Sequence, residues 1–261
     1  MSDKIGILIV LILEILGTCN HTMTKKVINQ NTKLNQELIN TIEPKFIFAD
    51  KPINRFNILE TNNGTLQINK EELLKNLKDQ INSIENCKLK ENSNKIILGE
   101  GNINSPLMLI GESPGAEEEK LGVPFRGEVG ELLNKMLIAI NIKRQNIYTS
   151  YAINFRPPDD RKPTSTEIKR YSVFLKEHIS IINPKIIVLM GSSAMEAVTG
   201  ISEKITTERG HWKEVILKNK TFPLMITFNP SYLIRFPENK KHSWEDLKKI
   251  RDKIKDLKLK I

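Results

Sequence analysis

Residues 107–115 have the sequence LMLIGESPG, in which four apolar side chains run directly into a glycine-bounded loop. A short, continuous apolar run of this kind is typical of a strand buried on both faces of a parallel sheet. A second such run, KIIVLM at 185–190, is followed by Gly191-Ser192-Ser193 and then by a helical pattern. Parallel strands bind ligands at their carboxyl ends, so the loops after both runs are candidate functional sites.

The spacing of apolar residues in the rest of the chain predicts strands that alternate with helices. Strands that alternate with helices form a mostly parallel sheet covered on both faces. We therefore predict an α/β fold, a three-layer α/β/α sandwich with a helical or irregular N-terminal extension. Helices are expected at 71–85, 130–140, 166–182 and 243–257, and further strands at 146–153, 213–217 and 224–228.

The chain is expected to divide into an N-terminal extension, 1–84, and a domain, 85–261. The extension contains an apolar segment, a polar linker and the first amphipathic helix. The apolar segment at 5–16 is too short to span a bilayer and contains Glu14. A buried helix, or translation from Met23, is favoured over an export signal. We thus expect a cytoplasmic protein with no membrane partner.

Charge and cysteine content narrow the class of protein. The chain has 40 Lys and Arg against 31 Asp and Glu, a formal net charge of +9, which favours a polyanionic partner such as nucleic acid. A composition rich in Ile, Lys and Asn produces the same charge in proteins that do not bind DNA, so the charge alone does not establish a nucleic-acid partner. Cys19 and Cys87 are too few for a disulfide framework, and neither lies in a C-x-x-C motif for zinc or iron–sulfur.

Three motifs carry most of the chemical information. They are GESPG at 111–115, VPFRG at 123–127 and NPSYLIR at 229–235. Together they resemble motifs of the iron–sulfur type (family 4) uracil-DNA glycosylases, and the similarity covers about residues 85–250. The resemblance implies a DNA-repair enzyme, a DNA N-glycosylase that flips out uracil or a related damaged base and hydrolyses its N-glycosidic bond.

The resemblance also implies roles for residues around a base pocket. Hydrolysis requires a carboxylate to assist water, a donor to stabilise the departing base and an aromatic ring to stack on it. Glu112 matches the family's water-positioning glutamate, and the alternative for it is a cap of the following turn or a lysine pair. Phe125 matches the stacking aromatic, and its alternative is core filling. The implied catalytic residues are Glu112 and Asn229, and the implied pocket residues are Gly111, Ser113, Pro114, Gly115, Phe125 and Tyr151.

DNA contacts are implied for two segments. The loop that contains Arg156 and Arg161 is stiffened by prolines and suits phosphate contacts, although a solvated basic loop is an equal alternative. In the late motif, Leu233 is expected to fill the gap left by a flipped base. The alternative is a strand-to-helix turn with Tyr232 and Leu233 in the core. The DNA-binding candidates are Arg156, Arg161, Ser231, Tyr232, Leu233 and Arg235.

The chain departs from the family at the four cysteines that hold a [4Fe–4S] cluster. Only Cys87 remains, and the other three positions are Lys90, Phe155 and Tyr171. One thiolate does not replace four. We therefore predict no iron–sulfur cluster and no other cofactor, with an apolar patch around Phe155 and Tyr171 in its place.

Two further departures concern the pocket. Tyr151 stands where the family has an asparagine that reads the uracil edge, and a phenol has fewer hydrogen-bonding groups and more bulk. Asn229 stands where the late motif usually has histidine, although mismatch-specific relatives are similar in having Asn-Pro-Ser there.

Three functions remain open from the sequence. The first is an active glycosylase with altered base preference, and the second is a weak or inactive relative that binds DNA or a damaged base. The third, a nucleotide-binding α/β protein, is disfavoured because no G-x-G-x-x-G or G-x-x-x-x-G-K-[ST] motif occurs. We expect single- or double-stranded DNA as the partner and a monomer.

Overall fold

The computed structural model describes residues 69–93 and 95–261. The predictions for the apolar segment at 5–16, the polar linker and Met23 lie outside the described residues. These described residues belong to one compact unit. It contains the first described helix, α2 (Lys70–Asn82), which precedes the predicted domain boundary after residue 84.

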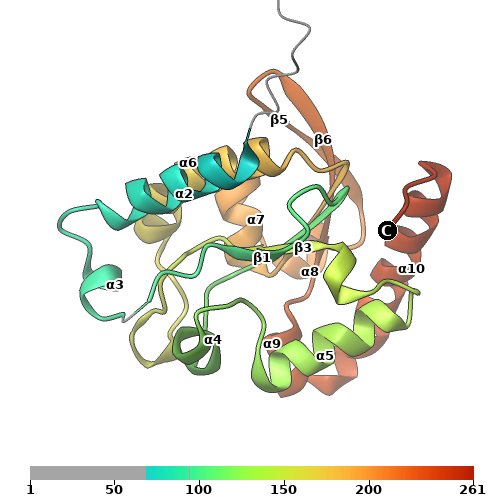
Figure 1. Cartoon of the computed structure of the whole chain (residues 1–261). Helices are drawn as coiled ribbons and strands as arrows, with labels where there is room; N and C mark the ends of the chain where they lie inside the picture. Colours follow the sequence, from blue (N-terminus) through green and yellow to red (C-terminus); the bar gives the residue numbers. More distant parts are fainter. Residues whose placement is uncertain (1–68, 94) are drawn as a thin grey trace, which may run out of the picture. The chain divides into compact units, whose positions relative to one another are not determined.

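In the described part of the chain, six strands form one sheet in the order β1-β3-β2-β4-β6-β5 (Figure 1). The edge strands β1 (Gly99–Gly101) and β5 (Trp212–Leu217) pair antiparallel with their neighbours. The central strands are parallel, as the short apolar runs predicted. They are β2 (Leu107–Gly111), β3 (Tyr148–Tyr151), β4 (Ile186–Met190) and β6 (Lys220–Thr227).

Helices cover both faces of this sheet (Figure 1). On one face lie α2, α6 (Ser165–Ile182) and α7 (Ser192–Thr199). On the other lie α5 (Gly127–Ile138), α9 (Pro230–Arg235) and α10 (Lys240–Asp256). The short elements are α3 (Lys88–Glu91), α4 (Ala116–Leu121), α8 (Ile205–Glu208) and the 3-10 turns η2 (Arg144–Asn146), η3 (Pro158–Asp160) and η4 (Pro237–Asn239).

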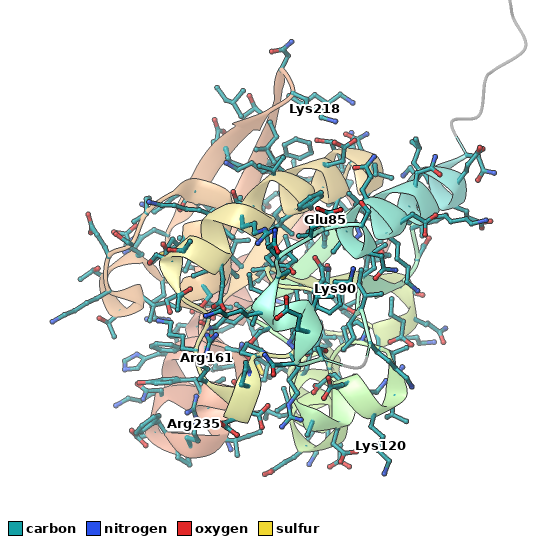
Figure 2. All side chains as sticks on the ribbon, turned by 90° about the vertical axis from the view of Figure 1, so that its left-hand side faces the viewer. Glu85, Lys90, Lys120, Arg161, Lys218 and Arg235 are labelled. Carbon is teal, nitrogen blue, oxygen red and sulfur yellow. The ribbon has the colours of Figure 1, made fainter. Side chains whose placement is uncertain are left out.

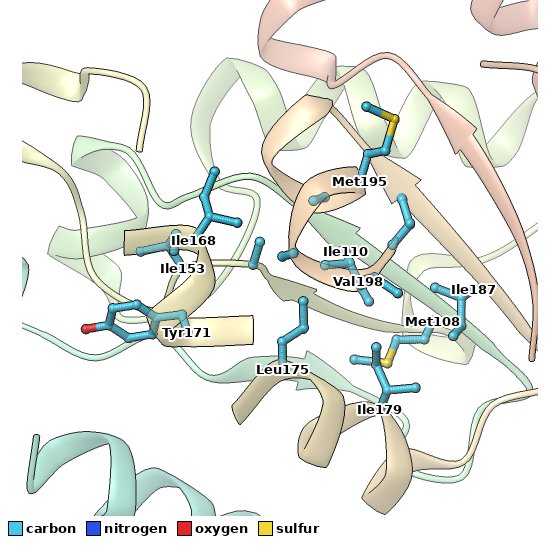
Figure 3. Close-up of a cluster of buried hydrophobic side chains, with 14 of the residues drawn as sticks. Met108, Ile110, Ile153, Ile168, Tyr171, Leu175, Ile179, Ile187, Met195 and Val198 are labelled. Atoms are coloured by element: carbon cyan, nitrogen blue, oxygen red, sulfur yellow. The ribbon is translucent and has the colours of Figure 1, made fainter. Parts of the chain in front are cut away.

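Alternating side chains of the central strands supply the two halves of the core. Met108 and Ile110 of β2 pack with α6 and α7 on one face, while Leu107 and Leu109 pack with α5 and α10 on the other. Figure 3 shows the first half, where Ile187 of β4 joins the same cluster. The predicted three-layer α/β/α architecture is confirmed. No helix in residues 69–93 and 95–261 is both long enough and apolar enough to cross a membrane.

One buried histidine links β3 to α6. His178 is 1 % exposed, its Nε2 lies 3.0 Å from Tyr148 Oη, and its Nδ1 lies 3.4 Å from Ser150 Oγ. Burial lowers the pKa of His178 from 6.5 to about 3. Near pH 6.5, where an unfolded histidine takes up a proton, the imidazole of folded His178 therefore remains neutral.

This difference predicts a pH-dependent stability. Below about pH 6.5 the histidine is protonated in the unfolded chain and neutral in the folded chain. The contribution of His178 to the free energy of unfolding is therefore fully present above that pH and decreases towards pH 3. Between pH 7 and pH 5 the loss from this one group is about 2 kcal/mol. Urea unfolding at both pH values measures it. His178→Gln is the control, because it keeps a donor and an acceptor without titrating; an equal loss in this variant would refute the assignment.

Candidate active site

The loops after three neighbouring strands meet at one edge of the sheet. Glu112 follows β2, and Asn229 follows β6. Between them lies β4, whose carboxyl end leads into Gly191. The Asn229 Nδ2 donates to Glu112 Oε2 at 3.3 Å, although the two residues are 117 positions apart. Two residues implied to be catalytic by separate motifs are thus in direct contact.

The start of α7 holds the other oxygen of Glu112. The Ser193 backbone N–H donates to Glu112 Oε1 at 3.0 Å, and Ser192 Oγ donates at 3.2 Å. A helix N-terminus offers free N–H groups to an anion, so a carboxylate is well placed there. Gly191 is required for this approach: its φ is +103°, and a Cβ would lie 2.4 Å from Glu112 Cδ. Neither sequence alternative, a cap of the following turn or a lysine pair, is observed for Glu112.

The amide of Asn229 has a fixed orientation. Its Oδ1 accepts from the Ser231 backbone N–H at 3.2 Å, which caps α9. Reversing the amide would set its oxygen against Glu112 and its NH2 against the Ser231 N–H, so the two contacts define which end faces the carboxylate. Asn229 is 5 % exposed. It therefore presents N–H donors, not an acceptor, to the neighbourhood of Glu112.

These residues line a cavity of about 620 Å³. The volume lies within the range of small-molecule sites and is sufficient for a nucleotide base. The walls combine the carboxylate of Glu112, the amide of Asn229, the Ser192 hydroxyl and aromatic surface from Tyr151 and Phe228. Ser113, Pro114 and Gly115 also line the cavity, as the first motif implied.

Glu118, which also lines the cavity, joins the first two motif loops. Its Oε2 accepts from the Gly115 N–H at 3.0 Å, and its Oε1 accepts from the Arg126 N–H at 3.0 Å. The side chain is 4 % exposed. A buried carboxylate needs such donors, and these come from both the GESPG and the PFRG segments. Glu118 was not among the predicted site residues, and its only signal in the sequence is its place in the first turn of α4 after Gly115.

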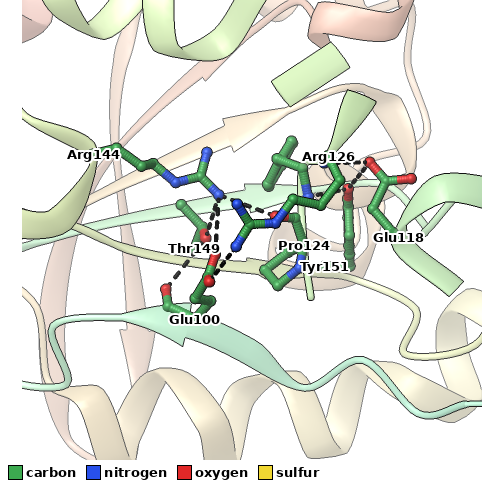
Figure 4. Close-up of polar contacts among 8 residues, drawn as sticks. Glu100, Glu118, Pro124, Arg126, Arg144, Thr149 and Tyr151 are labelled. Carbon is green, nitrogen blue, oxygen red and sulfur yellow. Dashed lines mark hydrogen bonds and ion pairs between the residues drawn. The ribbon is translucent and has the colours of Figure 1, made fainter. Parts of the chain in front are cut away.

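Tyr151 completes this arrangement (Figure 4). Its hydroxyl donates to Glu118 Oε1 at 3.2 Å and accepts from the Phe125 N–H at 3.0 Å. Burial, and then the charge of Glu118, raise the pKa of Tyr151 well above its usual range, so the hydroxyl remains a donor. The single O–H and one lone pair of the phenol are both used inside the protein, at the position where the family is implied to read the base.

Phe125 is placed differently from the expectation. It is 3 % exposed and does not line the cavity, whereas Tyr151 does. The two rings lie 4.7 Å apart at 31°, and the Arg144 guanidinium lies 5.3 Å from the Phe125 ring centre. Gly111 leaves room for the pair, because a Cβ there would lie 2.7 Å from Phe125 and 2.8 Å from Tyr151. In this conformation Phe125 fills the core, and Tyr151, which packs on it, is the one of the two rings that lines the cavity.

A polar network fixes the turn that carries Phe125 (Figure 4). Arg144 donates to the Pro124 carbonyl at 3.2 Å and to Thr149 Oγ1 at 3.0 Å. Arg126 pairs with Glu100 of β1. Burial lowers the pKa of Arg144, and the Glu100 carboxylate opposes that effect. The turn is thereby tied to the edge of the sheet.

The arginines implied to meet phosphates differ in their surroundings. Arg156 binds Asp160 through two hydrogen bonds of 2.7 and 2.8 Å and Glu119 through one of 3.2 Å, and it does not line the cavity. Arg161 lines the cavity and pairs with Glu167 at 2.7 Å, which holds the pKa of that carboxyl at about 2. Of these two arginines, Arg161 is therefore the one at the cavity.

The late motif forms the short helix α9, in which one side chain faces the core and others face the cavity. Leu233 is 1 % exposed and packs in the core, so the wedge role expected for it does not fit its position. The alternative, in which this residue fills the core, is the one observed for Leu233. Figure 2 shows Arg161 and Arg235 on one side of the molecule. The α9 residues that line the cavity are Ser231, Tyr232, Ile234 and Arg235.

The positions that correspond to the family's cluster cysteines lie close together but have different chemistry. Cys87 Sγ lies 3.2 Å from Tyr171 Oη, and the Phe155 and Tyr171 rings are 6.3 Å apart. All three are at most 5 % exposed, while Lys90 donates to the Asn82 carbonyl. Within the described residues, no group of three or more His, Cys, Asp or Glu is arranged to hold a metal. These side chains do not fit a four-thiolate cluster.

Comparison with known proteins shows the family of the chain. Residues 98–248 match the family model of the uracil DNA glycosylase superfamily, and the chain therefore belongs to that superfamily. It is 35 % identical to the type-4 uracil-DNA glycosylase of Thermotoga maritima over 189 residues, which cover 71 % of this chain and 97 % of that protein. It is 34 % identical over 187 residues to the type-4 uracil-DNA glycosylase of Sulfurisphaera tokodaii, with 69 % and 84 % covered.

The hydroxyl of Tyr151 is expected to contribute to stability. Tyr151→Phe leaves the buried Phe125 N–H without its acceptor, so unfolding should become easier by about 1 to 3 kcal/mol. Tyr232→Phe is the matched control, because the Tyr232 hydroxyl is partly exposed and has one long contact of 3.5 Å, to Asn239. Urea unfolding measures both. Equal stability of the two variants would show that the Tyr151 hydroxyl has no such role.

Proposed function

We propose that this protein is a DNA N-glycosylase that hydrolyses the bond between deoxyribose and uracil, or a related damaged base. The observation that carries the proposal is the contact of Glu112 with Asn229 at the wall of a base-sized cavity. Its curated relatives are named uracil-DNA glycosylases, which supports the choice of substrate class. Every residue of the proposed site comes from one chain, so a monomer is sufficient.

The proposed reaction assigns separate tasks to the two residues. A base flipped out of the strand enters the cavity, and its C1′–N bond breaks through an oxocarbenium-like state. Glu112 orients a water for attack on C1′ and takes up its proton. The departing base carries negative charge, which an N–H of Asn229 stabilises, since only one of its two N–H groups is used by Glu112. The products are the free base and an abasic site.

The base preference of this site is proposed to differ from that of a site with an edge-reading asparagine. The donor of Tyr151 is used by Glu118, and one of its lone pairs by Phe125. Recognition at this wall then depends on shape and aromatic contact more than on paired hydrogen bonds. Discrimination among similar bases is weaker without such bonds, so a related damaged base suits the cavity as well as uracil does.

The same observation supports a second candidate function. If Tyr151 fills the space that a base must enter, the protein binds DNA or a damaged base with weak turnover or none. Arg161 and Arg235 at the cavity would serve either function.

An excision assay tests the proposal. Single- and double-stranded oligonucleotides with one uracil, or another base lesion, are incubated with the protein and treated with alkali. We expect strand cleavage, reduced about a hundred- to ten-thousandfold in Glu112→Ala and Glu112→Gln, because the attacking water then has no carboxylate to take up its proton. Glu128→Gln is the matched control, since Glu128 also lines the cavity but lies on its exposed side. It should cleave at nearly the wild-type rate.

The outcomes separate the two candidate functions. Cleavage that disappears in the Glu112 variants alone supports the glycosylase. Folded protein that binds these oligonucleotides and cleaves none of them supports the binding protein. Equal activity of the wild type and Glu112→Ala would refute the role of Glu112.

We also propose that the protein folds and acts without a [4Fe–4S] cluster. Tyr171, Phe155 and Cys87 pack where thiolates would be needed. After anaerobic incubation with iron and sulfide, the desalted protein should contain no stoichiometric iron and no visible absorbance of a cluster. Cys87→Ser should behave in the same way and keep wild-type excision. A stoichiometric cluster that disappears in Cys87→Ser would contradict this proposal.

A further inference from the structure

We propose that Phe228, Tyr232 and Phe236 form an aromatic ladder from the cavity to the surface, on which an unpaired base of a DNA strand stacks next to the flipped nucleotide. This inference deepens the proposed function and rests on it for the identity of the strand. It concerns a binding surface outside the Glu112 and Asn229 contact.

The three rings follow one another in contact. The centres of Phe228 and Tyr232 lie 5.0 Å apart at 24°, a stacked pair, and those of Tyr232 and Phe236 lie 4.8 Å apart at 37°, a tilted pair. Tyr232 and Phe236 are four residues apart, and Phe236 is the C-cap of α9, so helical spacing brings them together. Exposure increases along the ladder, from 2 % at Phe228 to 45 % at Phe236. The last ring therefore has a surface with no neighbour of its own in the ladder.

The inner end of the ladder is held rigidly. The Arg209 guanidinium lies 5.4 Å from the Phe228 ring centre. Arg209 also pairs with Asp246, which is fully buried and accepts from Thr227 Oγ1 at 2.7 Å. These contacts join β6 to α10. A platform fixed in this way loses little conformational freedom when a base stacks on it.

The ladder borders the proposed site. Phe228 and Tyr232 line the cavity, and Phe236 follows Arg235, which also lines it. Within five residues of Phe236 along the chain, the exposed charged residues are Arg235, Lys240 and Lys241 and one acidic residue, Glu238. Aromatic faces next to cations are what single-stranded DNA binding requires, because bases stack while phosphates meet the charges.

An unpaired base is a better occupant than an apolar protein segment. Exposed apolar residues such as Val173 and Ile216 lie on α6 and β5. Phe236, in contrast, extends a stack and adjoins basic residues. Protein–protein contact or a second copy of the chain remains an outcome of the test.

The experiment measures binding of an undamaged, end-labelled single-stranded oligonucleotide and its duplex by fluorescence anisotropy over a range of salt concentrations. Phe236→Ala should weaken single-strand binding about five- to a hundredfold, with less effect on the duplex. Its salt dependence should match that of the wild type, because a ring releases no counterion. Arg235→Ala should lower the salt dependence. Ile216→Ala is the control for loss of exposed apolar surface, and it should bind as the wild type does.

A second variant shows whether stacking is the cause. Phe236→Trp should keep the single-strand affinity of the wild type. The fluorescence of the new tryptophan should decrease when the strand binds, after the change that the wild type shows from Trp212 and Trp244 is subtracted. Unchanged affinity of Phe236→Ala, or equal losses on single strand and duplex, would overturn the inference. So would a dimer that Phe236→Ala dissociates, because the ladder would then face a second copy.

The outcomes for this surface and for the enzyme are separable. If the protein excises uracil and Phe236→Ala does not change DNA binding, the proposed function stands and the stacking role of the ladder is refuted. If DNA binding depends on Phe236 and no base is excised, the stacking role stands and the glycosylase proposal is refuted.

Discussion

The hydrogen bonds that hold the Glu112 carboxylate are the interactions on which the rest of the site depends. Their donors come from the loops after β4 and β6, which follow β2 across the sheet. Parallel pairing brings the carboxyl ends of these strands together, so the register of the sheet determines where the carboxylate lies. The absence of a side chain at Gly191 allows the contact. The carboxylate is thus positioned by buried central strands of the sheet.

A second group of contacts fixes the wall that contains Tyr151. Glu118 receives hydrogen bonds from two loops and from Tyr151, and Tyr151 receives one from Phe125. Because the Glu118 carboxylate, the Tyr151 hydroxyl and the Phe125 N–H are buried, moving Tyr151 out of the wall would leave the Phe125 N–H unpaired and remove one donor from Glu118. Phe228 and Tyr232 supply further aromatic surface to the cavity.

Much of the fold follows from local sequence. The apolar runs at 107–110 and 185–190 coincide with β2 and β4, and the pattern at 166–182 coincides with α6, which Thr164 caps. Strand β1 was not predicted, because three residues with two glycines have no periodicity. For the late motif the sequence left two interpretations open, Leu233 as a wedge in DNA and a strand-to-helix turn with Leu233 in the core. A helix of six residues has too few turns for an apolar pattern to choose between them, and the structure shows Leu233 buried.

The sequence by itself determined the layered α/β fold, the superfamily and the candidates Glu112, Tyr151 and Asn229, because apolar period and short motifs are local properties of the chain. Only the tertiary structure decided what these residues contact. The pairing of Glu112 with Asn229, the burial of Phe125 and the bond from Tyr151 to Glu118 each join segments distant in the chain. Such contacts depend on the order of the strands in the sheet and on which side of each helix a residue lies, and no single stretch of sequence determines both.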